Sequence, residues 1–102
     1  MKLVIARSAL QDLKDIKAYY LDQGVPAVGL KFVSTILQKM QLLPDHPLSG
    51  REVPEFGQEQ IRELIYPPFR IVYMVQISKV SQISVVRVWR SERLLNLAED
   101  ET

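Results

Sequence analysis

The sequence predicts an α+β fold of two layers, in which a helical hairpin packs on one face of a mainly antiparallel sheet. Three observations carry this prediction: a short β-branched run near the N-terminus, two adjoining segments with helical spacing of apolar residues, and three strand-like segments joined by short turns near the C-terminus. The element order is therefore β-α-α-β-β-β(-α). The chain has 102 residues, the usual length of one domain, and we expect residues 1–102 to form a single one.

The N-terminal part of the chain predicts a strand followed by a helix. Residues 2–6 (KLVIA) are rich in β-branched side chains, which favour a strand. A helix is expected over residues 8–24, with Ser8 as its N-cap and with Asp12 and Asp15 in the early turns, where acidic side chains suit the helix dipole. The apolar stripe of this helix consists of Leu10, Leu13, Ile16 and Tyr20.

A tight turn connects the first helix to a second one. Gly24 is expected to end the first helix, and Pro26 suits the first position of the second, which is expected over residues 26–43. Because the connection is so short, the two helices should be antiparallel neighbours. The apolar face of the second helix comprises Val28, Phe32, Ile36, Leu37, Met40 and Leu43.

The rest of the chain predicts a long loop and three strands. Residues 44–59 hold three prolines and two glycines, which indicate a loop, and long loops in compact domains are often functional. Its only histidine, His46, has no cysteine or second histidine near it and is a poor metal ligand. Strands are expected over residues 60–66, 69–77 and 82–90, and a short helix or arm over residues 91–98.

The central strand of these three is apolar on nearly both sides, so it should lie inside the sheet. Phe69, Ile71, Tyr73 and Val75 share one of its faces, and Arg70, Val72 and Met74 share the other. Since the helical hairpin covers only one face, the other should expose arginines beside apolar residues, and we expect a partner to cover it.

Positive charge gathers on the strands. The whole chain carries a net charge of +1, but five cations stand against one acid between residues 60 and 91. This distribution favours an anionic partner at the sheet. The other interpretation is that most of these arginines are solvated or paired with acids of the helices.

Composition excludes several classes of protein. The chain has no cysteine, which excludes a disulfide scaffold, a thiolate nucleophile and a cysteine-ligated zinc site. The apolar run at the N-terminus is too short for a signal peptide or a membrane span, so we expect a cytoplasmic protein without membrane association. Glycine-rich phosphate loops are absent from the sequence, and no cofactor or metal is expected.

Several short motifs in this order resemble the RelE/ParE superfamily of bacterial toxin–antitoxin toxins. The first helix contributes A-x-x-D-L-x-x-I-x-x-Y, the loop P-x-x-G-R, and the three strands R-E-L, F-R-I-V-Y and R-V-x-R-x-x-R in turn. The residues in these motifs are Ala9, Asp12, Leu13, Ile16, Tyr19, Pro47, Gly50, Arg51, Arg62, Glu63, Leu64, Phe69 to Tyr73, Arg87, Val88, Arg90 and Arg93. The resemblance implies a toxin that is neutralised in a hetero-oligomer by a cognate antitoxin, which is encoded beside it.

The superfamily has two branches with different targets. RelE-like members cleave messenger RNA on the ribosome, and ParE-like members poison DNA gyrase. A metal-independent nuclease needs groups that take and give protons as well as cationic clamps. The positions that resemble the RelE lysines hold Ile61 and Glu63 here, and the position of a catalytic histidine in a related subgroup holds Arg90.

Two further RelE-like positions, an arginine and a tyrosine near the C-terminus, hold Ser91 and Leu97 here, so only Arg70 remains from that pattern. An arginine stays protonated and cannot supply the proton transfers. The sequence therefore resembles the ParE branch, which implies inhibition of DNA gyrase by binding. The alternatives are a ribosome-dependent nuclease acting on messenger RNA and a non-toxic module that only binds an antitoxin.

These interpretations lead to three sets of candidate residues. The residues expected to bind the target are Arg87, Trp89, Arg90 and Arg93. Those expected to bind the antitoxin are Arg62, Arg70, Met74 and Tyr20. No catalytic residue is expected, and the nuclease alternative would use Arg70, Arg51, Arg90 and Glu52, with Glu55 or His46 as further loop candidates.

Three of the candidates have a structural interpretation as well. Arg70 either clamps an anion on the open face or forms a buried pair with Glu63 on the adjacent strand. Trp89 is either a contact residue for a partner or a core aromatic. Tyr73 is expected to be a core residue, because it alternates with Ile71 and Val75.

Overall fold

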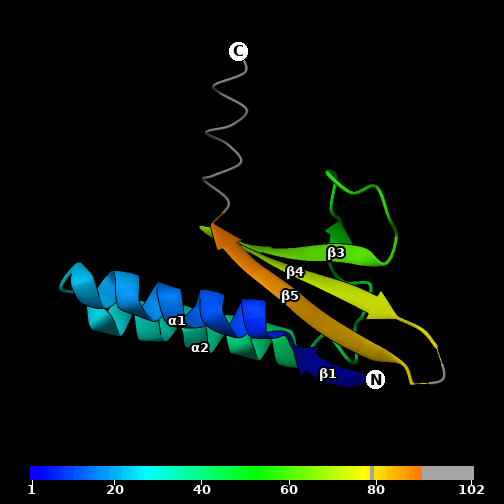
Figure 1. Cartoon of the computed structure of the whole chain (residues 1–102), viewed down its shortest axis with the longest axis horizontal. Coiled ribbons are helices and arrows are strands. Elements are labelled where there is room, and N and C mark those ends of the chain that lie inside the picture. The colour runs from blue at the N-terminus through cyan, green and yellow to red at the C-terminus, as the bar shows by residue number, and fades with distance from the viewer. Residues whose placement is uncertain (79, 91–102) are drawn as a thin grey trace, which may run out of the picture.

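The computed structural model describes residues 1–78 and 80–90, which form a five-stranded sheet with two antiparallel helices on one side (Figure 1). The elements are β1 (Lys2–Ile5), α1 (Arg7–Asp22), α2 (Pro26–Gln41), β2 (Arg51–Glu52), β3 (Ile61–Tyr66), β4 (Phe69–Gln76) and β5 (Gln82–Arg90). The predicted α+β class and element order are confirmed. The expected helix or arm over residues 91–98, with Arg93, lies outside the described residues.

The strands lie in the order β1-β5-β4-β3-β2. The pairs β3–β4 and β4–β5 are antiparallel, so the predicted meander is confirmed, and β4 is central as its apolar sequence indicated. β1 pairs in parallel with the first half of β5, from Lys2 opposite Gln82 to Ile5 opposite Val85. The first strand of the chain is thus held by the last of the described strands, with the helical hairpin between them in sequence.

The start of α1 differs from the prediction. The helix begins at Arg7 after Ala6, which gives it no side-chain cap, and its first turn contains no acidic residue. The Ser8 hydroxyl instead donates to the carbonyl oxygen of Val86 at 2.6 Å, and the backbone N–H of Val88 donates to Asp12 Oδ2 at 2.8 Å. The prediction that Ser8 is an N-cap and that the aspartates serve the helix dipole was therefore wrong.

The reason lies in the free edge of β5. β1 ends opposite Val85, and no strand of the described residues continues along the second half of β5 on that side. Unpaired backbone groups at a strand edge need partners, and side chains of α1 supply them. A bulge at this point leaves Val86 without a register partner on β4, between the pairs Tyr73–Val85 and Val72–Arg87.

The core lies between the hairpin and one face of the sheet. Phe69, Ile71, Tyr73 and Val75 of β4 all join it, as the alternation predicted. On the helices the buried core residues are Ala9, Leu13, Ile16, Val33, Ile36 and Met40, with Phe32 and Tyr20 partly buried against them. Leu43, just after α2, is also buried in the core. The predicted stripes were wrong at Leu10 and Val28, which are 44% and 40% exposed.

A close approach of the two helices explains the exposure of Val28. Gly29 faces Tyr20, and a Cβ on Gly29 would lie 2.9 Å from the Cβ of Tyr20. The helices therefore meet on the face that carries the glycine, and Val28 turns toward solvent. Pro26 does occupy the start of α2, as predicted, and Gly24 has a positive φ of 76° just after α1.

The long loop contains a strand that the sequence did not predict. Arg51 and Glu52 pair with Glu63 and Arg62 as the two-residue strand β2 at the edge of the sheet. Two residues are too few for an alternating pattern to be visible in the sequence. No helix among residues 1–78 and 80–90 is long and apolar enough to cross a membrane.

Candidate functional surface

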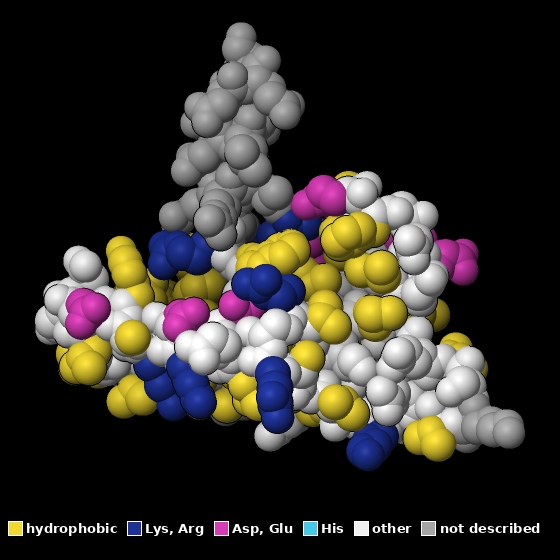
Figure 2. Space-filling view, viewed as in Figure 1, with side chains coloured by type: hydrophobic (Ala, Val, Ile, Leu, Met, Phe, Trp, Pro, Cys, Tyr) yellow, Lys and Arg dark blue, Asp and Glu magenta, His cyan; other side chains and the backbone are white. Residues whose placement is uncertain are grey.

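The face of the sheet without helices carries two rows of side chains that cross the strands. Ile65, Arg70 and Trp89 are partners in one row, on β3, β4 and β5. Arg51, Glu63, Val72 and Arg87 form the next row, from β2 to β5. Since strand residues in register share a face, these side chains lie on one surface, which we call the open sheet face. Figure 2 shows hydrophobic side chains gathered over the strands in this view.

A chain of ion pairs lies within this surface. Arg70 Nε donates to Glu63 Oε1 at 2.5 Å, and Arg51 Nε donates to Glu63 Oε2 at 2.7 Å. Arg70 also binds Glu55 with two nitrogens, Nη1 at 3.0 Å and Nη2 at 3.2 Å. The Arg70 and Glu63 side chains are only 2% and 0% exposed, whereas Arg51 is 60% exposed. The buried pair that was one of the two interpretations of Arg70 is therefore present.

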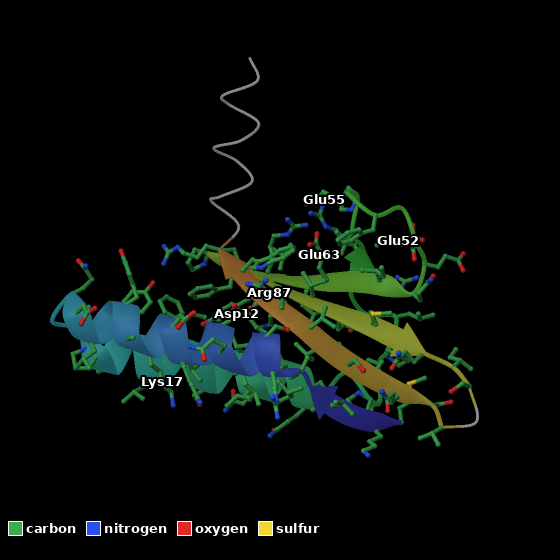
Figure 3. All side chains as sticks on the ribbon, in the orientation of Figure 1. Asp12, Lys17, Glu52, Glu55, Glu63 and Arg87 are labelled. Atoms are coloured by element: carbon green, nitrogen blue, oxygen red, sulfur yellow. The ribbon has the colours of Figure 1, made fainter. Side chains whose placement is uncertain are left out.

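The β5 end of the same surface is held to α1. Arg87 Nε and Nη2 donate to the two carboxylate oxygens of Asp12 at 2.8 and 2.9 Å. These hydrogen bonds raise the pKa of the Arg87 guanidinium above its ordinary value. The guanidinium also lies over the ring of Trp89, 5.2 Å from its centroid. Figure 3 shows Asp12 and Arg87 pointing toward each other between α1 and β5.

Arg90 belongs to a different environment. Its register partner is Phe69, which faces the core, so Arg90 lies on the helix side of the sheet. Its guanidinium lies 5.5 Å from the ring of Tyr19 and 5.7 Å from that of Phe69, and it donates to the hydroxyl of Tyr20 at 3.3 Å. Of the residues expected to bind the target, Arg87 and Trp89 therefore lie together on the open sheet face, whereas Arg90 lies on the opposite face, beside the helices.

The residues expected to bind the antitoxin do not form one surface. Arg70 and Met74 lie on the open sheet face, since Arg70 pairs with Trp89 and Met74 with Ile61. Arg62 lies on the other side and donates to the carbonyl oxygens of Gly50 and Glu59, both at 2.9 Å. Tyr20 packs among aromatic rings of the hairpin. The four residues thus lie in three separate places, and one partner would have to wrap around the sheet to touch all of them.

The residues that the nuclease alternative would use also lie on different faces of the sheet. Glu52 is the register partner of Arg62, whereas Arg51 is the partner of Glu63, so the two neighbours point to opposite faces. Arg70 has its guanidinium occupied by two carboxylates. Among residues 1–78 and 80–90, no three His, Cys, Asp or Glu side chains are grouped as metal ligands.

A second surface lies along the hairpin, away from the open sheet face. A shallow groove there is lined by Lys17 of α1 and by Leu30, Val33, Leu37 and Gln41 of α2. Leu30 is 57% exposed, and Figure 3 shows Lys17 on the opposite side of the hairpin from the sheet. The groove therefore combines apolar side chains with the polar Ser34, Gln38 and Gln41 and with a cation, Lys17, which suits an amphipathic helix with an acidic flank.

Tyr73 fixes the long loop against the central strand. Its buried hydroxyl donates to the carbonyl oxygen of Pro47 at 2.8 Å and accepts from the backbone N–H of Gly50 at 2.9 Å. Burial raises the pKa of the Tyr73 phenol above its ordinary value of 10.0, because the charged form would lose its hydration. Tyr73 is a core residue, as expected, with an added role as the anchor of residues 47–50.

Replacement of Tyr73 by phenylalanine should lower the free energy of unfolding by about 1–3 kcal/mol, because two buried backbone groups lose their partner. The native state of the wild type holds the phenol proton more tightly than the unfolded chain does. The contribution of the protonated Tyr73 phenol to the free energy of unfolding is complete below pH 10, and it is lost as the pH rises through the higher native pKa. Urea unfolding at pH 7 and above pH 10 should show this loss in the wild type and a flatter dependence in Tyr73→Phe.

The matched control is Tyr19→Phe, because Tyr19 is 50% exposed and its ring contacts survive without the hydroxyl. Its stability should stay within about 0.5 kcal/mol of the wild type. Equal losses in the two variants would contradict the anchoring role of Tyr73.

Comparison with known proteins agrees with this geometry. The family model described as "ParE toxin of type II toxin-antitoxin system, parDE" matches residues 3–95. A solved structure titled "Chromosomal ParDE TA system from P. aeruginosa" is similar with a TM-score of 0.72 and 26% sequence identity, over 88% of this chain and 95% of that one. No curated protein matches.

The fold and the match over nearly the whole chain define a toxin of the type II toxin–antitoxin class, within the RelE/ParE superfamily. The chain belongs to the ParE toxin family. The sequence motifs of the first helix, the loop and the strands had already indicated this branch.

Proposed function

We propose that this chain is a toxin that binds DNA gyrase and blocks its cycle by contact, and that a cognate antitoxin neutralises it. Membership of the ParE family supports the class of target. The observation that favours contact over cleavage is the occupation of Arg70 by Glu63 and Glu55. Even when the half-exposed Glu55 gives way, the buried Glu63 stays beside the guanidinium and would repel the negative charge that develops on a reacting phosphate. Arg70 itself stays protonated and could not supply the proton transfers of cleavage.

The surface proposed for gyrase is the β5 end of the open sheet face. Trp89 is partly exposed there, and Arg87 is stacked on it and fixed by Asp12. Tryptophan and arginine held in fixed positions are the residue types that most often dominate binding energy at interfaces. The antitoxin is proposed to use the groove of the hairpin and the open sheet face. The open sheet face carries Arg70 and Met74 of the four expected contacts, whereas Arg62 and Tyr20 do not line the groove.

Purified toxin at micromolar concentration should inhibit supercoiling by gyrase, and Trp89→Ala should weaken this inhibition by about 30-fold, as expected for a central interface residue. The matched control is Ile77→Ala, because Ile77 is 79% exposed and follows β4 at the other end of the sheet. Ile77→Ala should inhibit like the wild type.

Unchanged supercoiling at micromolar wild-type toxin would contradict the proposal. So would toxin-dependent ends in translated transcripts, detected by primer extension, because they would indicate cleavage of messenger RNA on the ribosome. Equal inhibition by Trp89→Ala and the wild type would place the contact elsewhere on the chain.

A further inference from the structure

The two carboxylates that bind Arg70 differ in how firmly they are held. Glu63 comes from the neighbouring strand β3, and its side chain is completely buried. Glu55 comes from the loop between β2 and β3, and its side chain is 44% exposed. Glu55 binds the outer end of the guanidinium, at Nη1 and Nη2, while Glu63 contacts Nε and shares Nη2 from the inner side.

The charge of Arg70 is already offset without Glu55. Glu63 supplies the buried negative charge, and Arg51 holds the second oxygen of Glu63 from the edge strand. The segment around Glu55 is anchored by its own turn, in which Phe56 and Gly57 donate to the carbonyl oxygen of Val53. The Glu55 side chain can therefore leave Arg70 without breaking any ladder of the sheet.

The surroundings of this outer position are those of a binding site. The register partners of Arg70 are Ile65, which is 45% exposed, and the partly exposed Trp89. Arg51 and Arg87 occupy the two ends of the neighbouring row, with side chains 60% and 42% exposed. An incoming segment with an acidic residue between apolar ones would match this pattern in both charge and polarity.

We propose that Glu55 occupies the place that a carboxylate of the antitoxin takes in the complex, so that binding exchanges one carboxylate for another on Arg70. This inference depends on the proposed neutralisation by an antitoxin and assigns that partner an acidic residue at the centre of its contact with the open sheet face. Glu55 then acts as an internal competitor, and the apparent association constant is the intrinsic one multiplied by the fraction of molecules in which Glu55 has released Arg70.

The inference is tested with Glu55→Gln and the purified protein encoded by the gene that adjoins this one. Glutamine keeps the size of the side chain but loses the charge, so it competes weakly for the guanidinium. The dissociation constant should fall by about threefold to thirtyfold, the range expected when one charged competitor is removed. Glu55→Gln should remain folded, because Arg70 keeps Glu63, and circular dichroism of the free variant checks this.

The matched control is Glu59→Gln, which removes the same charge from the same loop. Glu59 contributes its backbone carbonyl to Arg62, and its carboxylate forms none of the ion pairs found among the described residues. The dissociation constant of the complex between Glu59→Gln and the antitoxin should stay within about twofold of the wild-type value. This variant measures how much the loss of one negative charge alone strengthens binding to an acidic partner. A tightening by Glu55→Gln well beyond that of Glu59→Gln supports the exchange.

Equal or weaker binding by Glu55→Gln would overturn the inference, and so would an adjoining-gene product that does not bind the wild-type chain. Inhibition of gyrase by the toxin alone is measured without this protein. A toxin that fails to inhibit gyrase but binds more tightly as Glu55→Gln would contradict the proposed target and support the exchange.

Discussion

Replacing Glu63 with alanine should lower the free energy of unfolding by about 3–5 kcal/mol, the loss expected when a buried ion pair is broken from one side. Arg70 would stay buried with only the half-exposed Glu55 to offset its charge. A domain of this size has a total stability on the order of 5–10 kcal/mol, so a large part of it would be lost. Urea unfolding of the wild type and of Glu63→Ala at pH 7 measures the difference.

Two further variants show whether the buried charge is the cause. The double variant Glu63→Leu with Arg70→Met replaces both charges with apolar groups of similar size and should recover most of the loss. Glu52→Gln changes an exposed carboxylate on the edge strand and should stay within about 0.5 kcal/mol of the wild type. A loss below about 1 kcal/mol for Glu63→Ala would mean that Arg70 is satisfied without Glu63.

Replacing Gly50 with alanine should cost about 3 kcal/mol or more, because the added methyl group has no room. A Cβ on Gly50 would lie 2.5 Å from the carbonyl oxygen of Glu63 and 2.7 Å from the hydroxyl of Tyr73. Relief would require movement of the backbone of β3 or loss of the hydrogen bond between Gly50 and Tyr73. The same unfolding measurement detects this loss.

Gly57 provides the comparison. It has a positive φ of 60°, and a Cβ added there would meet no atom of the described residues within 4 Å, so Gly57→Ala would introduce backbone strain alone. That strain should cost about 1 kcal/mol. If Gly50→Ala were no more harmful than Gly57→Ala, the contact between the loop and β3 would be looser than the structure indicates.

The sequence predicted those parts of the fold that depend on local patterns. The alternation of β4 assigned Phe69, Ile71, Tyr73 and Val75 to the core face, and the structure confirms it. The helical hairpin followed from two apolar periodicities around Gly24 and Pro26. In these elements each residue's role is set by its neighbours in the chain, so the pattern is visible without the fold.

The sequence did not predict features that depend on distant partners. Ser8 and Asp12 look like helix-start residues, but the edge of β5, more than 70 positions later, takes their side chains. The faces of the helices were misplaced at Leu10 and Val28. At Val28 the cause is the close approach between Gly29 and Tyr20, two residues on different helices. β2 was missed because it is only two residues long.

The candidate surface was predicted in part. The pair between Arg70 and Glu63 was one of two interpretations, since cross-strand neighbours of opposite charge attract. The bidentate hydrogen bonds between Arg70 and Glu55 were not predicted. A loop sequence has no periodic pattern that would indicate which strand residue a loop side chain contacts. The role of Arg87 as a tether to α1 was likewise hidden by the distance in sequence to Asp12.

The parallel pairing of β1 with β5 has a consequence for synthesis. β1 is synthesised before every other described element, yet its hydrogen-bonding partner β5 is the last of the described strands to be made. Pairings so far apart in sequence close large loops and are slow to form. The sheet therefore reaches its complete order only after β5 has been synthesised, and until then the nascent chain holds β1 without its partner strand.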